Sequence, residues 1–382
     1  MSNKLTYLDI ASWGGFMSFA SSGIVIPLCL PEISKTLNIS LSQGGAMETA
    51  RTFIILAVLL ISGIIANRWG KKLLMAIGQY LIAIGAIMAS YSQDYYILII
   101  SLMIMGIGGG ATEAIINPLV LDIHPNESNK YLSLTNAFYP IGVIISALLF
   151  GELLTLGYSW RSLFLFIAII ALAMGFIFNI SKFPEQRNQK IFSWNLIRNV
   201  LFLKVFWIYS FAIFLAAGVE SAFTFWSRSY VEIYLHDLPR AGAIAVVVFS
   251  CGMALGRFLA ARLSNKVSPK ILMIWSSFFG LLITIYVTFI TNLILFAVLL
   301  FFAGIATACF WPNILAVAAE DLDTDATILM VLLAVFGVAG FGFIPWVMGM
   351  IGDNMDLKSS FLLLPVCFLG LIFLSKIILR KV

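Results

Sequence analysis

Three residues inside one long apolar stretch could carry chemistry: Glu113, Asn117 and Pro118. Glu113 and Asn117 are four residues apart, so they would share one face of a helix. Pro118 has no N–H group and would leave a nearby backbone carbonyl without its usual helical partner. A carboxylate, an amide and a carbonyl on one face suit the hydroxyl groups of a sugar, and the carboxyl could also take up and release a proton. The alternative is a structural pair with an arginine or a backbone group of a neighbouring helix.

A second acid, Glu220, lies in another apolar stretch among Phe223, Phe225 and Trp226. Sugars present hydroxyl edges and apolar C–H faces, so a carboxylate beside aromatic rings suits them. Glu220 and Trp226 are therefore predicted to contact a solute. Aromatic side chains at helical spacing without such an acid would more often indicate packing.

Arg51 has two interpretations. Glu48 lies three residues earlier, so the two side chains could neutralise each other on one helix face. Alternatively, Arg51 could bind an anionic solute, because a guanidinium group matches a carboxylate or a sulfonate in a bidentate way. The first interpretation places the pair in the lining of an outer vestibule.

Weaker candidates for solute contact lie in two further apolar stretches. Asn136 and Tyr139 stand beside Pro140, and Asn313 follows Trp311. Trp311 has packing as its alternative role. An acidic segment that contains Glu320, Asp321, Asp323 and Asp325 is expected to be a solvated end, with Arg68 or Lys71 as a possible charge partner.

The elements that must position these residues follow from composition. The chain has 382 residues, of which 61% are hydrophobic and 11% charged, with a mean hydropathy of +1.03. Soluble domains are about 45–50% apolar and about 25% charged, so a soluble fold is excluded. A helix that spans a bilayer needs about 20 mostly apolar residues. The sequence predicts an all-α membrane protein with twelve spans, near residues 9–30, 42–66, 71–92, 96–121, 131–154, 160–181, 205–230, 240–264, 270–290, 293–319, 327–350 and 360–378.

Most predicted connections are short, and the exception is the basic stretch 182–204. We therefore expect an N-terminal bundle of six helices over 1–181, a cytoplasmic linker over 182–204 and a C-terminal bundle over 205–382. Lys and Arg residues concentrate at the ends that share a side with the N-terminus, which places both termini in the cytoplasm of a cell membrane protein. The apolar run from Ile10 continues past the length of a signal peptide and is predicted to be the first span.

An internal repeat supports this division. The loop from Asn67 to Met75 resembles the loop from Asn265 to Met273, with an offset of 198 residues. Two related bundles around a central cavity are typical of secondary transporters, which bind their solute near the middle of the bilayer.

The segment Gly63 to Lys72 (GIIANRWGKK) resembles the G-x-x-x-D-R-x-G-R-R signature of the major facilitator superfamily. The resemblance implies a gating role in conformational change for these signature positions: Gly63, Asn67, Arg68, Gly70 and Lys71. Asn67 stands where the signature has an Asp, so it can form hydrogen bonds but offers no charge to a cytoplasmic charge network.

Four further segments are similar to the fucose/galactose/glucose:proton symporter family. They are the run from Gly106 to Pro118, the run from Gly218 to Tyr230, the pair Gly256-Arg257, and Phe310 to Ile314. The resemblance implies that Glu113 binds sugar and couples it to protons, with Glu220 as a second coupling acid, and that Asn136 contacts sugar. Arg257 is expected to be a structural residue near the cytoplasmic end of its span, with a part in gating.

The first span departs from this family. Proton-coupled fucose permeases have an Asp four residues before the Pro of helix 1, and the corresponding position here is Gly23. No acid lies between Asp9 and Pro27. Coupling would then run through Glu113 or Glu220 alone, or the protein would be a facilitator.

The sequence therefore predicts a secondary transporter for a small polar solute, a monosaccharide or polyol, with proton coupling and alternating access. The alternatives are an organic-anion carrier that uses Arg51, a drug or metabolite exporter, and a non-transporting sensor. We find no Walker A motif or other enzyme signature, and no Cys/His spacing for a metal. We expect no cofactor and no nucleic acid, with the solute, protons and membrane lipids as partners of a monomer.

Overall fold

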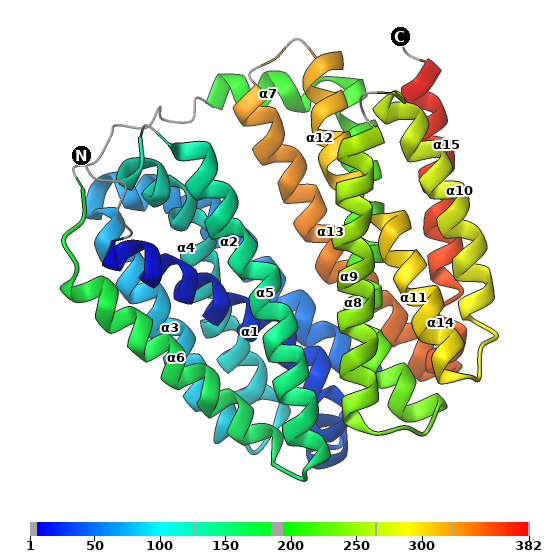
Figure 1. Ribbon diagram of the computed structural model, residues 1–382, viewed down its shortest axis with the longest axis horizontal. Helices are drawn as coiled ribbons and strands as arrows, with labels where there is room; N and C mark the ends of the chain where they lie inside the picture. Colours follow the sequence, from blue (N-terminus) through cyan, green and yellow to red (C-terminus); the bar gives the residue numbers. More distant parts are fainter. Residues whose placement is uncertain are drawn as a thin grey trace. The chain divides into compact units, whose positions relative to one another are not determined.

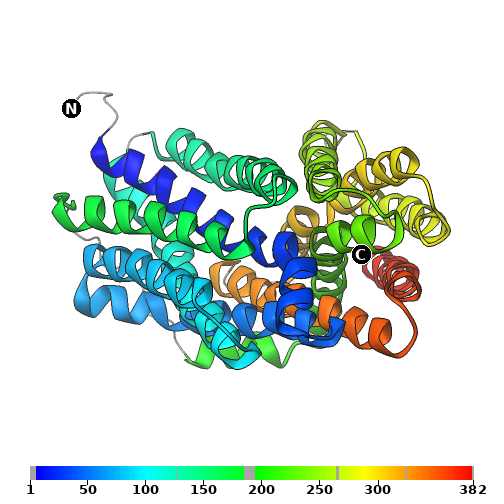
Figure 2. The same cartoon turned by 90° about the horizontal axis from the view of Figure 1, so that it is seen from below.

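The computed structural model describes residues 6–380 except 126, 185–193, 264–265, 323 and 325, and the regular elements in those residues are α-helices. By contacts the chain divides into two units (Figures 1 and 2). Unit 1 comprises Met1–Ile39 and Ala50–Ile191, and unit 2 comprises Ser40–Thr49 and Phe192–Val382. The described residues contain twelve helical segments long and apolar enough to cross a membrane, which confirms the predicted fold class.

Six helices run through the first half of the chain, and unit 1 holds all of them except the first turns of the second. They are α1 (Tyr7–Leu37), α2 (Leu41–Trp69), α3 (Lys71–Ser90), α4 (Tyr95–Ile123), α5 (Ser128–Thr155) and α6 (Trp160–Ile180).

The remaining helices lie in unit 2, where some predicted spans are built from two helices in sequence. They are α7 (Trp194–Leu201), α8 (Lys204–Tyr234), α9 (Pro239–Leu263), α10 (Pro269–Val287), α11 (Leu293–Thr307), α12 (Phe310–Asp321), α13 (Ala326–Asn354), α14 (Leu357–Ser360) and α15 (Leu363–Arg380).

The first helix is longer than predicted. It starts at Tyr7 because Thr6 and Asp9 form a capping box, and it continues through Pro27 and Pro31 to Leu37. The predicted end at residue 30 was wrong, because proline is tolerated inside membrane helices. The helix stops where Asn38 adopts a left-handed conformation with φ of 52°.

The predicted span at 293–319 is divided into α11 and α12. Pro312 lies in the first turn of α12 and has no N–H group to donate to the carbonyl of Ala308. The ladder resumes with Asn313, whose N–H group donates to the carbonyl oxygen of Cys309 over 3.1 Å. The break therefore follows from one residue inside the span.

The predicted linker 182–204 falls partly outside the described residues. Its described part includes the short helix α7, from Trp194 to Leu201. The boundaries of the two predicted bundles remain predictions, although the division by contacts also falls within this stretch.

Small residues allow close helix packing in both units. In unit 1, α3 packs against α4 and α6, and α1 packs against α5. A Cβ atom added to Gly108 on α4 would lie 2.2 Å from the carbonyl oxygen of Gly78 on α3. The glycine cluster of α4 is therefore a packing feature.

In unit 2, α8 packs against α13, α9 against α11, and α10 against α15. A Cβ atom on Gly252 of α9 would lie 2.1 Å from the carbonyl oxygen of Phe301, and one on Gly304 of α11 would lie 2.3 Å from that of Phe249. The backbones of α9 and α11 thus approach each other through glycines on both helices.

Candidate functional site

Glu113 lies on α4 of unit 1 and is partly buried. Its carboxylate has no hydrogen-bond or ion-pair partner among the residues that the structure describes. An ionised group inside a membrane span is costly unless it is paired or hydrated. The structural pair that was the alternative for Glu113 is therefore missing from the described part of the chain.

Asn117 and Asn136 meet one turn further along α4. The side-chain amide of Asn136 donates to Oδ1 of Asn117 and to the carbonyl oxygen of Leu132, both over 2.8 Å. Asn136 is exposed and Asn117 is partly buried. The structure thus brings together two amides that the sequence placed on separate helices, and amides of this kind can donate to and accept from hydroxyl groups.

Tyr139 and Arg51 converge on the same point of α1. A Cβ atom built on Gly23 would lie 3.8 Å from the hydroxyl oxygen of Tyr139, and 3.7 and 3.8 Å from the two terminal nitrogens of Arg51. Arg51 is only 8% exposed. The Tyr139 ring packs 5.5 Å from that of Phe19, between centroids. Gly23 therefore leaves the space in which these two groups approach α1.

In unit 2, Glu220 of α8 faces Arg257 of α9. The distance from Oε1 of Glu220 to Nη2 of Arg257 is 3.9 Å, and the two side chains are 19% and 56% exposed. The sequence placed Arg257 in the gating set. That role stays a prediction, and the structure brings Arg257 to Glu220, so Arg257 joins the candidate site.

Trp226 and Asn313 differ in what they offer to a solute. Trp226 is fully buried, and its indole N–H group donates to the carbonyl oxygen of Pro345 on α13 over 3.0 Å. The side chain therefore packs within unit 2, and its contact with a solute stays a prediction. Asn313 carries a buried side-chain nitrogen without a hydrogen-bond partner in the described residues. Trp311 packs against Gly337, with 2.3 Å between its ring and a Cβ atom built there.

Two of the five predicted signature residues have a defined structural role at the α2–α3 connection. Gly70 has a φ of 89°, which favours glycine, at the N-cap of α3. The ammonium group of Lys71 donates to Asp122 of α4 over 2.5 Å and to the carbonyl oxygen of Pro118 over 3.3 Å. Arg68 is exposed. The surroundings of Gly63 and of the Asn67 side chain lie outside the described part of the structure.

The acidic end of α12 has a different partner from the one predicted. Asp321 accepts hydrogen bonds from Lys270 of α10 over 2.8 and 2.9 Å, and another from the hydroxyl group of Tyr209 on α8. The suggested pairing of this segment with Arg68 or Lys71 is wrong for Asp321. Asp323 and Asp325 lie outside the described residues.

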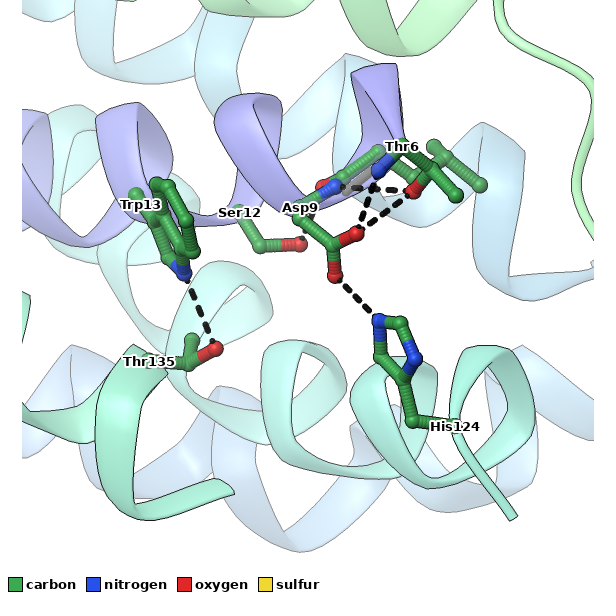
Figure 3. Close-up of polar contacts among 7 residues, drawn as sticks. Thr6, Asp9, Ser12, Trp13, His124 and Thr135 are labelled. Atoms are coloured by element: carbon green, nitrogen blue, oxygen red, sulfur yellow. Dashed lines mark hydrogen bonds and ion pairs between the residues drawn. The ribbon is translucent and has the colours of Figure 1, made fainter. Parts of the chain in front are cut away.

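A buried polar pair at the start of α1 was missed. Asp9 is fully buried, and Nε2 of His124 lies 2.7 Å from its Oδ1 (Figure 3). The other carboxylate oxygen accepts from the backbone N–H and the hydroxyl group of Thr6. The His124 ring stacks on Tyr131 with 3.5 Å between centroids. The only acid before a long acid-free span and one of two histidines were the available signals.

The model of the family described as "Major Facilitator Superfamily" matches residues 11–243 and 234–381. The chain belongs to the major facilitator superfamily. The Lys71–Asp122 and Lys270–Asp321 pairs are therefore features of a major facilitator chain, one in each unit.

Several superfamily relatives are similar in sequence over part of the chain. A protein TsgA homolog from Buchnera aphidicola is 25% identical over 64% of this chain and 63% of its own length. The riboflavin transporter RibZ from Clostridioides difficile is 27% identical over 50% and 42%. The quinolone resistance protein NorA from Staphylococcus aureus is 27% identical over 36% and 34%. The chain thus spans less than two thirds of the length of each of these relatives.

Solved superfamily structures share the fold. A bacterial homolog of the human lysosomal transporter Spinster matches with a TM-score of 0.87 and 15% identity, over 98% of this chain and 97% of that one. The E. coli fucose:proton symporter FucP matches with a TM-score of 0.64 and 18% identity, over 97% and 98%. At these identities the likeness concerns the fold alone.

Proposed function

We propose that this chain is a secondary active transporter that moves a small polar solute, of the size of a monosaccharide or polyol, together with protons. In this proposal Glu113 carries the proton, and Asn117 and Asn136 bind hydroxyl groups of the solute. Glu220 is the second acid. Family membership supports transport, and the acids inside the spans support the proposed coupling to protons.

The observation that carries the proposal is the state of Glu113. Its carboxyl lies inside a membrane-spanning helix, and no partner among the described residues neutralises it. Charged groups in such positions mark ion or proton pathways in transporters. The hydrogen-bonded amides of Asn117 and Asn136 lie one turn away and give a solute both donors and acceptors.

The test is proton-driven uptake by the purified protein in liposomes. The solute panel contains neutral monosaccharides, polyols, sugar acids and riboflavin, the last because of the similarity to RibZ. Glu113→Gln should abolish accumulation against a gradient and leave exchange of internal for external solute measurable. Glu152→Gln, which changes an acid at the far end of α5, is the matched control. Unchanged accumulation by Glu113→Gln would remove Glu113 from the mechanism.

A second candidate function is transport of an organic anion through Arg51. The specific observation in its favour is the convergence of both terminal nitrogens of Arg51 and the hydroxyl group of Tyr139 at Gly23. Arg51→Gln should then cripple uptake of sugar acids and leave uptake of neutral sugars unchanged. Equal loss for both classes would assign Arg51 to the packing of α2 against α1 and α4.

A further inference from the structure

Helix α9 presents three different faces. Its first face meets α11, where Gly252 and Gly256 lie against the backbone of Phe301 and Ile305. Its second face carries large exposed apolar side chains, as expected where a helix contacts lipid: Leu255, Phe258 and Leu259. Its third face follows the helical spacing of four, three and four residues and carries small or polar side chains: Ser250, Ala254, Arg257 and Ala261.

Arg257 is the charged residue of that third face. Arg257 follows Leu255 by two residues, which is a rotation of about 200° around the helix axis. Its side chain therefore points away from the apolar face that carries Leu255, which we call the lipid-type face. Its side chain is nevertheless 56% exposed. Charged side chains inside a span that do not face lipid lie against the bundle interior or against water. The third face of α9 therefore presents Arg257 at the surface of unit 2, away from the lipid-type face.

Glu220 is the one acid that approaches this guanidinium group in the described residues. The separation of 3.9 Å is too long for a hydrogen bond, and no other described group bonds to Arg257. A guanidinium group has five N–H donors. Arg257 thus keeps most of its hydrogen-bonding capacity for something other than protein.

The other charged groups on the packed elements are engaged elsewhere or distant in sequence. Arg228 of α8 pairs with Glu232, and Asp321 of α12 pairs with Lys270. Helix α11 contains no ionisable side chain from Leu293 to Thr307. In α13 the one ionisable residue between Ile328 and Asn354 is Asp353, which binds the N–H groups of Leu41 and Ser42. Among the described residues, Glu220 is therefore the acid that faces Arg257.

We propose that Arg257 binds an acidic group of the transported solute, and that protonation of Glu220 makes it available. With Glu220 ionised, its carboxylate and that of a solute compete for one guanidinium group. When Glu220 takes up a proton, its negative charge is removed and a solute carboxylate can accept two hydrogen bonds from the Arg257 guanidinium group. Proton and anionic solute would then bind together, and the solute class becomes a small polyhydroxy acid.

This inference rests on the proposed transport function for its purpose, but its binding test does not. It assigns the anion to Arg257 rather than to Arg51, because Arg51 is only 8% exposed. The Arg51 side chain also packs against α4, where a Cβ atom built on Gly106 would lie 3.4 Å from its Cγ. Arg257, in contrast, carries a charge and has a side chain that is exposed enough for a solute to reach.

The experiment compares D-glucuronate with D-glucose, which share a ring and differ in a carboxylate. Calorimetric titration of the purified full chain at pH 5.5 and pH 8 gives the affinity ratio of the two probes. We expect glucuronate to bind more tightly, with the preference larger at pH 5.5. Arg257→Gln should reduce the ratio at least about tenfold, since one bidentate pair is lost. Arg257→Lys should retain part of it, and Arg262→Gln on the same helix is the control.

Glu220→Gln should change glucuronate affinity in the opposite direction from Arg257→Gln. A gain in affinity cannot come from misfolding. Glu220→Gln should raise glucuronate affinity at pH 8 to its value at pH 5.5 and remove the pH dependence. Equal heats from the two probes in the wild type, zero included, would overturn the inference, as would a ratio that Arg257→Gln leaves unchanged. Glucuronate binding through Arg257 without proton-driven uptake would retain this inference and remove the proposed function. Proton-driven glucose uptake with an unchanged ratio would do the reverse.

Discussion

The two units are alike at one end and different in the middle. Lys71 of α3 binds Asp122 of α4, and Lys270 of α10 binds Asp321 of α12. Each partner in unit 2 lies 199 residues after its counterpart in unit 1. Further into the spans, Glu113 of unit 1 has no charged partner in the described residues, whereas Glu220 of unit 2 faces Arg257.

This difference distinguishes contacts that belong to the repeated architecture from residues that the proposed transport would use. The Lys–Asp pairs join the same two elements in each unit, so they belong to the shared architecture. The acids in the middle of the spans have different surroundings, which suits two different tasks: Glu113 alone for a proton, and Glu220 with Arg257 for a proton and an anion.

The largest expected effect comes from breaking the shared pairs. Asp122→Ala would leave the ammonium group of Lys71 buried without its partner, which costs about 3–5 kcal/mol of stability. Asp321→Ala should cost less, because the Lys270–Asp321 pair is more exposed, with side chains at 11% and 17% against 7% and 6%. Unfolding in detergent, followed by tryptophan fluorescence, measures both. An equal or reversed order would show that burial does not set the difference.

The next effect concerns the Asp9–His124 pair of unit 1. In the described part of unit 2, the start of α8 has no corresponding pair. Asp9→Asn removes the charge that binds His124 and Thr6, and we expect a loss of about 1.5–3 kcal/mol. His124→Phe keeps a ring against Tyr131 and loses only the bond to Asp9. If this variant is as stable as the wild type, the carboxylate serves the helix cap alone.

A smaller effect compares two tryptophans. Trp226→Phe loses the buried hydrogen bond to Pro345, and we expect a cost of about 1 kcal/mol with unchanged solute affinity. Trp13→Phe loses a 3.2 Å bond to Thr135 in unit 1 at a less buried position, so its cost should be lower (Figure 3). Thermal unfolding beside a binding titration distinguishes the roles. A fall in affinity at constant stability would return Trp226 to the solute site.

The smallest effect is expected at Gly23. A Cβ atom there meets its neighbours at 3.7–3.8 Å, which is ordinary contact, so Gly23→Ala should change the unfolding free energy by less than about 1 kcal/mol. Gly108→Ala is the contrast, because its Cβ atom would lie 2.2 Å from a carbonyl oxygen. A large loss from Gly23→Ala would mean that Arg51 and Tyr139 need this space empty.

The sequence predicted the elements better than their pairings. Apolar length is enough to find twelve spans, because the bilayer sets one length for all of them. It did not predict that α1 continues through Pro31 to Leu37, since proline ends helices in water more readily than in lipid. The loop alignment gave an offset of 198, whereas the ion pairs follow 199. Lys270 is the second residue of α10, but Lys71 is the first of α3.

The candidate site was predictable within one helix and not between helices. The shared face of Glu113 and Asn117 follows from a spacing of four residues. Two contacts depend on how separate helices pack against each other: Arg257 approaches Glu220, and Asp321 binds Lys270. Residue spacing along one helix does not encode such packing. The same holds for the hydrogen bond from the Trp226 indole N–H to a carbonyl oxygen of α13.

The glycines between α9 and α11 have a consequence for the electrostatics of unit 2. Because Gly252, Gly256 and Gly304 admit the opposite backbone where no methyl group would fit, α9 is seated on α11 in one rotational setting. A rotation of α9 about its own axis would carry Arg257 away from Glu220 and toward the acyl chains. The orientation of the Arg257 side chain is thus set by glycines that have no Cβ atom. A methyl group added at one of them would change this orientation.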